Sequence, residues 1–110
     1  MAGALNVFKT IRANLTASMT AVYTPPLGYA TVILMAQVSN ITGNTITISA
    51  NVSNATTSTS LIKNATCPTG DAITVLTGRL VLTFGENFAI QATVADSGQL
   101  TLSLLESLAG

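Results

Sequence analysis

The stretch TITISANVS at residues 45–53 alternates regularly between polar and apolar side chains. Ile46, Ile48, Ala50 and Val52 occupy every second position, and threonine, serine or asparagine stands between them. Successive side chains of a β-strand point to opposite faces of the sheet, so this period of two predicts a strand with one buried and one solvated face. A strand of this kind needs a second layer of structure to cover its apolar face.

On both sides of this stretch, Gly, Pro, Asn and Asp interrupt the chain at intervals of about eight to twelve residues, the spacing typical of a sandwich or barrel. Threonine, which is β-branched and suits a pleated surface, occurs 18 times. The further segments that we expect to be strands are residues 6–15, 19–24, 29–39, 61–64, 72–77, 79–84, 88–95 and 99–108. We therefore predict an all-β protein, a single-domain antiparallel β-sandwich of the jelly-roll or Ig-like type with about eight short strands.

The predicted domain covers residues 1–110, with residues 1–18 as an N-terminal arm or first strand. The segment 29–39 is apolar on both faces, which is typical of a strand that is covered on both sides or lies in a subunit contact. We expect Val32, Leu34, Ala36 and Val38 on one face, and Ile33 and Met35 on the other. In the segment 99–108 the doubled Leu104-Leu105 predicts a bulge. A short helix is the alternative there, and we favour a strand because no helix cap precedes the segment.

The chain carries few charges, 7% of its residues, and its formal net charge is zero. Its four basic residues, Lys9, Arg12, Lys63 and Arg79, are scattered singly, whereas a nucleic-acid surface needs a basic patch. Near-zero net charge favours association, so we expect the chain to belong to an assembly. We see neither a secretory signal nor an apolar run of membrane-spanning length, and we expect synthesis in the cytoplasm without export.

Chemically active side chains are sparse. Histidine is absent, and Asp71, Glu86 and Asp96 lie in expected turns, where a carboxylate usually caps its own loop. The single cysteine, Cys67, has no basic neighbour in sequence and is expected to fill space in the interior. These residues predict no enzyme activity, no cofactor, no metal and no small-molecule substrate.

Most of the chain, from about residue 8, resembles the small β-sandwich structural proteins of tailed bacteriophages, as found in phages of cyanobacteria and marine bacteria. Shared features are a Tyr-Thr-x-Pro-x-Gly turn, an apolar strand ending near Asn, and a Lys-Asn before a Pro-x-Gly turn. A Leu-x-Leu before a Gly-Asp or Gly-Glu turn and a hydrophobic final strand ending in Leu-Glu complete the pattern. Here they are Tyr23, Thr24, Pro26 and Gly28; Asn40; Lys63 and Asn64; Pro68 and Gly70; Leu80 and Leu82; Gly85 and Glu86; Leu105 and Glu106.

The resemblance implies a location in the virion and a non-enzymatic role in capsid decoration or cement, neck or tail. The expected partners are further copies of the chain, with a trimer as one arrangement, and other virion proteins such as major capsid, neck or tail subunits. Our candidate interface residues are Tyr23, Tyr29, Ile33 and Met35.

Two further classes of protein stay open. The first is a carbohydrate- or receptor-binding sandwich of a tail fibre or adhesin, in which Tyr23 and Tyr29 form a stacking platform. The second is a fimbrial or surface-layer subunit of the host, for which we would expect a signal peptide.

Overall fold

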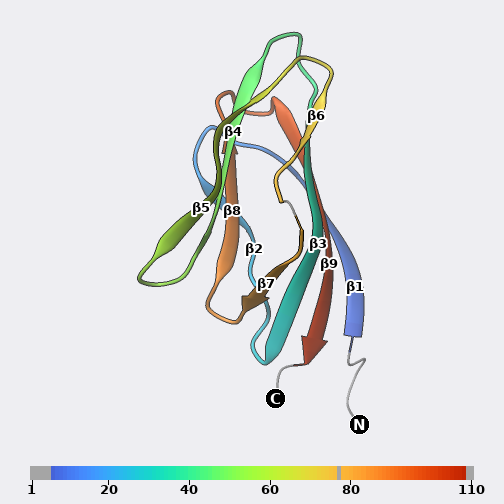
Figure 1. Cartoon of the computed structure of the whole chain (residues 1–110), viewed down its shortest axis with the longest axis vertical. Helices are drawn as coiled ribbons and strands as arrows, with labels where there is room; N and C mark the ends of the chain where they lie inside the picture. Colours follow the sequence, from blue (N-terminus) through green and yellow to red (C-terminus); the bar gives the residue numbers. More distant parts are fainter. Residues whose placement is uncertain (1–5, 77, 109–110) are drawn as a thin grey trace.

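The structure is a computed structural model that describes residues 6–76 and 78–108 of the chain. These residues form two antiparallel sheets that face each other (Figure 1). The strands are β1 (Asn6–Asn14), β2 (Thr20–Tyr23), β3 (Tyr29–Asn40), β4 (Ile46–Ser53), β5 (Ser58–Cys67), β6 (Ala72–Thr74), β7 (Leu80–Thr83), β8 (Asn87–Ala92) and β9 (Gly98–Leu108). The predicted all-β sandwich is confirmed, and residues 99–108 form a strand rather than a helix.

The order of the strands distinguishes between the two predicted types of sandwich. One sheet, which we call sheet A, has the order β1-β9-β3, and β6 and β7 both pair with β3. The other, sheet B, has the order β2-β8-β4-β5. Strands β6 and β7 pair with different parts of the same edge of β3. They therefore share one place in the strand order of sheet A, and the chain is interrupted between them near Gly78. Counted in this way, eight strand positions are shared between two four-position sheets, which is the architecture of a jelly roll.

The core lies between the two sheets and is built from the inward-facing positions of each strand. The regular alternation predicted for residues 45–53 is observed, since Ile46, Ile48 and Ala50 are buried. Phe88 is completely buried. The further core side chains are Leu15, Tyr23, Ile33, Ala36, Val38, Cys67, Val75, Leu76, Leu82, Ile90, Ala92, Leu100, Leu102 and Leu104.

The predicted faces of residues 29–39 were wrong because the bulge lies in β3 and not in β9. Ile33 pairs with Leu104 and Met35 pairs with Ser103, so β3 has one extra residue at this point. The extra residue shifts the alternation, and Ile33 therefore lies on the buried face together with Ala36. Across the same place β9 alternates without interruption, so the bulge predicted at Leu104-Leu105 was also wrong.

Several other boundaries differ from the prediction. Strand β5 is longer than the predicted 61–64, because its exposed Ser and Thr residues pair with β4 although they carry no apolar signal. Strand β8 ends at Ala92, and Val94 lies exposed in the following turn, where Ser97 donates to its carbonyl. Strand β6 ends at Thr74, before the end of the predicted strand 72–77, of which Thr77 lies outside the described residues. Residues 6–14 of the predicted arm or first strand form β1, and residues 1–5 lie outside the described residues.

Candidate functional site

The four candidate interface residues lie in different environments. Tyr23 and Ile33 are part of the core, at 8% and 0% exposure, so neither side chain is available to a neighbouring protein in the folded chain. Tyr29 is half-buried at the start of β3. Met35 is exposed beside the β3 bulge. The ring of Tyr23 points into the molecule, so the two tyrosines do not form an exposed platform for a sugar.

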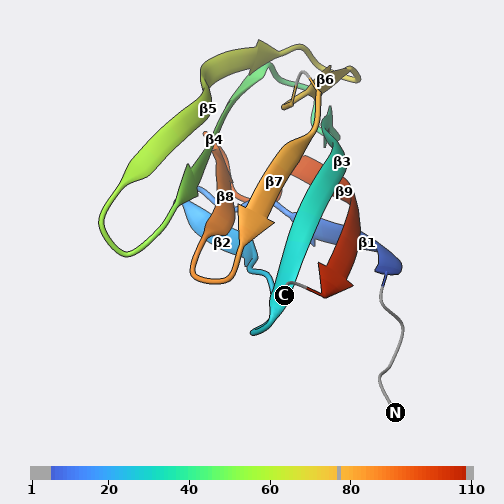
Figure 2. The ribbon, with the colours of Figure 1, turned by 60° about the horizontal axis from the view of Figure 1, so that its bottom comes forward.

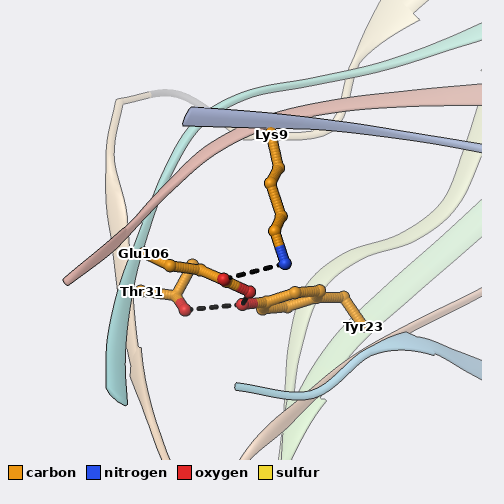
Figure 3. Close-up of polar contacts among 4 residues, drawn as sticks. All are labelled: Lys9, Tyr23, Thr31 and Glu106. Atoms are coloured by element: carbon orange, nitrogen blue, oxygen red, sulfur yellow. Dashed lines mark hydrogen bonds and ion pairs between the residues drawn. The ribbon is translucent and has the colours of Figure 1, made fainter. Parts of the chain in front are cut away.

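Tyr23 instead belongs to a buried polar cluster of four residues that joins β1, β2, β3 and β9 (Figure 3). Its hydroxyl donates to Glu106 Oε2 at 2.6 Å, and it therefore accepts the hydrogen bond from Thr31 Oγ1 at 2.7 Å. The Lys9 ammonium lies 2.9 Å from Glu106 Oε1. The side chain of Glu106 is only 5% exposed, while that of Lys9 is 45% exposed.

Both acidic groups of the cluster have shifted pKa values. Burial, helped by the neighbouring Glu106 carboxylate, raises the pKa of Tyr23 to about 12. For Glu106, burial alone would raise the pKa, but the hydrogen bond from Tyr23 and the contact with Lys9 outweigh it and hold the pKa below its usual value. Glu106 is therefore ionised and Tyr23 protonated at neutral pH.

This arrangement directs the polar atoms of the cluster towards one another. Each carboxylate oxygen of Glu106 already has a partner, and the Tyr23 hydroxyl uses its proton within the cluster. The cluster attaches the edge strand β1 to the middle of the sandwich through a charge-assisted contact. Our interpretation of the sequence did not single out Glu106 for this role, although the alternation of Leu100, Leu102 and Leu104 places it on the inward face.

Two of the turn carboxylates behave as predicted. Asp71 Oδ1 accepts a hydrogen bond from the next backbone amide, and Glu86 Oε1 accepts from the amide and hydroxyl of Thr83. Asp96 occupies a turn with a positive φ of 60°. The predicted interior role of Cys67 is confirmed, since it is completely buried. Burial raises the pKa of its thiol, which disfavours the reactive thiolate.

The outer face of sheet A carries a line of apolar side chains that the sequence analysis did not find. Leu105 of β9 pairs with Phe8 of β1 on one side and with Val32 of β3 on the other, and Val32 also pairs with Val81 of β7. Directly opposed residues of antiparallel strands project from the same face. We call these four residues the apolar row. It crosses β1, β9, β3 and β7, which lie side by side in Figure 2.

The ends of the apolar row are well exposed, Phe8 at 76% and Val81 at 59%. Leu34 and Met35, at 38% and 36%, extend the apolar surface next to Val32. The neighbouring paired positions are small or polar: Asn6, Ser107, Ala30 and Thr83 on one side, and Thr10 and Ser103 on the other. This face is therefore a nearly uncharged surface with an apolar centre.

Residues 6–76 and 78–108 contain no helix long and apolar enough to cross a membrane. Among the same residues no three His, Cys, Asp or Glu side chains come together as metal ligands.

The sequence matches no known family model and no curated protein. Solved structures do share the fold. The subunit of Bacillus endospore appendages, described as disulfide-linked pili, superimposes with a TM-score of 0.55 and 14% identity over 96% of this chain and 88% of its own. A protein of the T13 particle of IBDV gives a TM-score of 0.57 and 10% identity over 97% of this chain, which spans only 32% of that protein.

A third similar structure, the nucleoplasmin-like N-terminal domain of Drosophila FKBP39, has a TM-score of 0.52 and 11% identity, and the match covers 100% of this chain and 98% of that domain. At these identities the likeness shows the fold alone. The chain has a β-sandwich fold that also occurs in a viral particle and in a pilus.

Proposed function

We propose that this chain is a non-enzymatic structural subunit of a tailed-bacteriophage virion that assembles with copies of itself and with neighbouring virion proteins. Within the virion we favour capsid decoration or cement, or a component of the neck or tail. Assembly would take place in the cytoplasm of the host bacterium. The observation that carries this proposal is the apolar row on the outer face of sheet A.

The apolar row is better suited to a subunit contact than to open solvent. Isolated surface apolar residues are common, whereas contiguous ones mark contact sites. The row extends over three interstrand spacings, about 14 Å, and presents side chains from four strands in register. A neighbouring subunit that covers Phe8 and Val81 would remove the most exposed of these side chains from water. Burying each of them contributes about 1.5–3 kcal/mol.

The charge distribution supports contact between identical copies. The net charge is zero, and among the paired outward positions of β1, β9, β3 and β7 only Arg12 is charged. Two copies that meet through this face therefore bring together few like charges. In a two-fold dimer both copies would use this same face, whereas in a closed ring such as a trimer the face would contact a different surface of the next copy.

The comparison of folds supports a structural role at a coarse level. The fold occurs in a viral particle and in the pili of endospores, both of which are assemblies of repeated subunits. The pili are described as disulfide-linked, whereas the thiol of Cys67 is buried in this chain, so its contacts would be non-covalent.

Gold labelling of intact phage particles with an antibody against the purified chain tests the proposed location. We expect label on particles: label spread over the heads would assign capsid decoration, and label at one vertex or along the tail would assign the neck or tail. Absence of label from particles that contain the gene, with the antibody proven on denatured particles, would refute a virion role on the surface.

One surface feature favours the second candidate, a carbohydrate- or receptor-binding module. An open depression of about 390 Å³ on sheet A is lined by Arg12, Ala13, Asn14, Gln99, Leu100 and Thr101. Its polar side chains can donate and accept hydrogen bonds, as recognition of a sugar requires. Glycan-array binding that is lost in Gln99→Ala but kept in Thr59→Ala, a change on the distant strand β5, would support this candidate over the first.

A further inference from the structure

Strand β1 is an open edge of sheet A that differs from the other edges of the described chain. It pairs with β9 over nine consecutive residue pairs without a shift in register, and its outer side meets no described strand (Figure 1). The other edges are short or irregular. Strand β2 has four residues and a register shift, β5 has two register shifts, and β6 and β7 have three and four residues.

Proteins normally protect an exposed edge with proline, with bulges, with charged side chains or with a covering segment. Strand β1 contains neither proline nor a bulge. Of its two charged side chains, Lys9 is engaged in the ion pair with Glu106, and Arg12 projects from the outer face of the sheet. The edge is therefore regular along its described length.

The hydrogen bonds at the end of β1 show which backbone groups are free. The amide of Leu15 donates to the carbonyl of Gly98, so these two residues form a hydrogen-bonded pair of the β1–β9 ladder. Hydrogen-bonded pairs recur at every second residue, which turns the amides and carbonyls of Asn6, Phe8, Thr10, Arg12 and Asn14 towards the open side. The bond from the amide of Ile41 to the carbonyl of Ser97 fixes the same alternation on the other side of β9.

We propose that β1 pairs in antiparallel orientation with β1 of a second copy of this chain, about a two-fold axis at Thr10. In this register all nine residues of both strands overlap, and roughly ten backbone hydrogen bonds form between the groups that face outward. The two sheets A then continue into each other across the axis.

The overlap and the side chains favour this register, since an axis at Ile11 would reduce the overlap to residues 8–14. With the axis at Thr10, Phe8 lies opposite Arg12 of the partner subunit, a pair that gains from a cation–π contact. Lys9 lies opposite Ile11 of the partner subunit. An axis at Lys9 or at Arg12 would instead place two like charges directly opposite each other, which is destabilising.

The pairing stands independently of the proposed virion role, because it concerns the edge of sheet A and requires no particle. A strand of nine residues is about 30 Å long, and a contact this narrow belongs at the low end of protein interfaces. We therefore expect a weak dimer that becomes populated as concentration rises, and that is reinforced inside a larger assembly.

Cysteine cross-linking under mild oxidation tests the pairing and its register. The probe is the purified chain with single exposed substitutions Thr10→Cys, Asn6→Cys or Asn14→Cys, with the wild type as the control for buried Cys67. We expect Thr10→Cys to form covalent dimers at least about tenfold faster than either other variant alone, since a disulfide requires Cα atoms within about 7 Å. Two copies of Asn6 lie about 27 Å apart in this register.

An equimolar mixture of Asn6→Cys and Asn14→Cys is expected to cross-link, because Asn6 lies opposite Asn14 of the partner subunit. Equal rates for all single variants, or no cross-link for Thr10→Cys, would overturn the proposal. Sedimentation velocity of Val81→Asp, in which contact through the apolar row is disfavoured, supplies a second test. Val81→Asp should still form the dimer, and adding Thr10→Pro, which removes an outward amide, should abolish it. If Val81→Asp alone stays monomeric, or if the double variant dimerises as Val81→Asp does, the proposal fails.

Discussion

Replacing Tyr23 with phenylalanine removes the hydroxyl that donates to Glu106 and accepts from Thr31, and leaves the ring in the core. Glu106 then keeps only the Lys9 contact at 2.9 Å, while one of its carboxylate oxygens is buried without a donor. A hydrogen bond to a buried charged group is worth about 1.5–3 kcal/mol. We therefore expect the free energy of unfolding to fall by about 2–3 kcal/mol, or about 1 M in the urea midpoint.

The matched control is Tyr29→Phe, which removes a hydroxyl from a half-buried tyrosine and should change stability by less than about 0.5 kcal/mol. Urea unfolding of the three proteins, followed by far-ultraviolet circular dichroism at low concentration, measures both effects. The pKa of Glu106 is lowered in the folded state, so its ionised form stabilises the fold at neutral pH, and this stabilisation is lost as the pH falls through that pKa. The difference between wild type and Tyr23→Phe should thus shrink in acid. Equal stabilities of Tyr23→Phe and Tyr29→Phe at pH 7 would refute the assigned role of the cluster.

Three further predictions concern the fold. The pKa of Tyr23 is raised from 10.0 to about 12, so its protonated form stabilises the fold fully below pH 10. Between pH 10 and pH 12 the free energy of unfolding of the wild type should therefore fall by about 2–3 kcal/mol, and that of Tyr23→Phe should not show this fall. Urea titrations at the two pH values measure the difference. Gly98→Ala places a Cβ 3.1 Å from Leu15 Cδ1 and from Val38 Cγ1, and should lower the free energy of unfolding by about 1–3 kcal/mol, as measured by thermal unfolding. In the control Gly43→Ala the new Cβ meets nothing within 4 Å, and an equal loss of stability there would contradict the packing argument. Asn40→Ala removes the side-chain amide that donates to the buried carbonyl of Cys67, and should cost about 1–3 kcal/mol. The control Asn54→Ala, whose amide oxygen caps an exposed turn, should cost less, and a reversed order in urea midpoints would contradict this expectation.

The sequence predicted the elements whose signal is local. Residues 45–53 alternate because sheet B has one buried face, and the period of two survives in the folded chain. The turns after Tyr23 and before Phe88 were found from their Pro and Gly residues. The Ser- and Thr-rich part of β5 was missed because an exposed edge strand needs no apolar alternation.

Features that depend on pairing could not be predicted from one strand at a time. The extra residue of β3 exists only relative to β9, and it reversed the faces assigned to Ile33. The apolar row likewise requires three pairings at once, since Phe8 and Val81 are far apart in sequence and neither stands out alone. The inward position of Glu106 could have been predicted from the alternation of β9 in the sequence. Its partners Lys9 and Tyr23 could be identified only from the folded structure, because they lie on other strands.

The central claim is that the outer face of sheet A is covered by a neighbouring copy. Sedimentation velocity of the wild type and of Val81→Asp over a concentration series tests it most directly, with Thr59→Asp on β5 as the control that adds the same charge elsewhere. We predict that wild type and Thr59→Asp form species larger than a dimer, and that Val81→Asp stops at the dimer formed through β1. A wild-type chain that stays monomeric at every concentration, or a Val81→Asp variant that assembles as the wild type does, would contradict the claim.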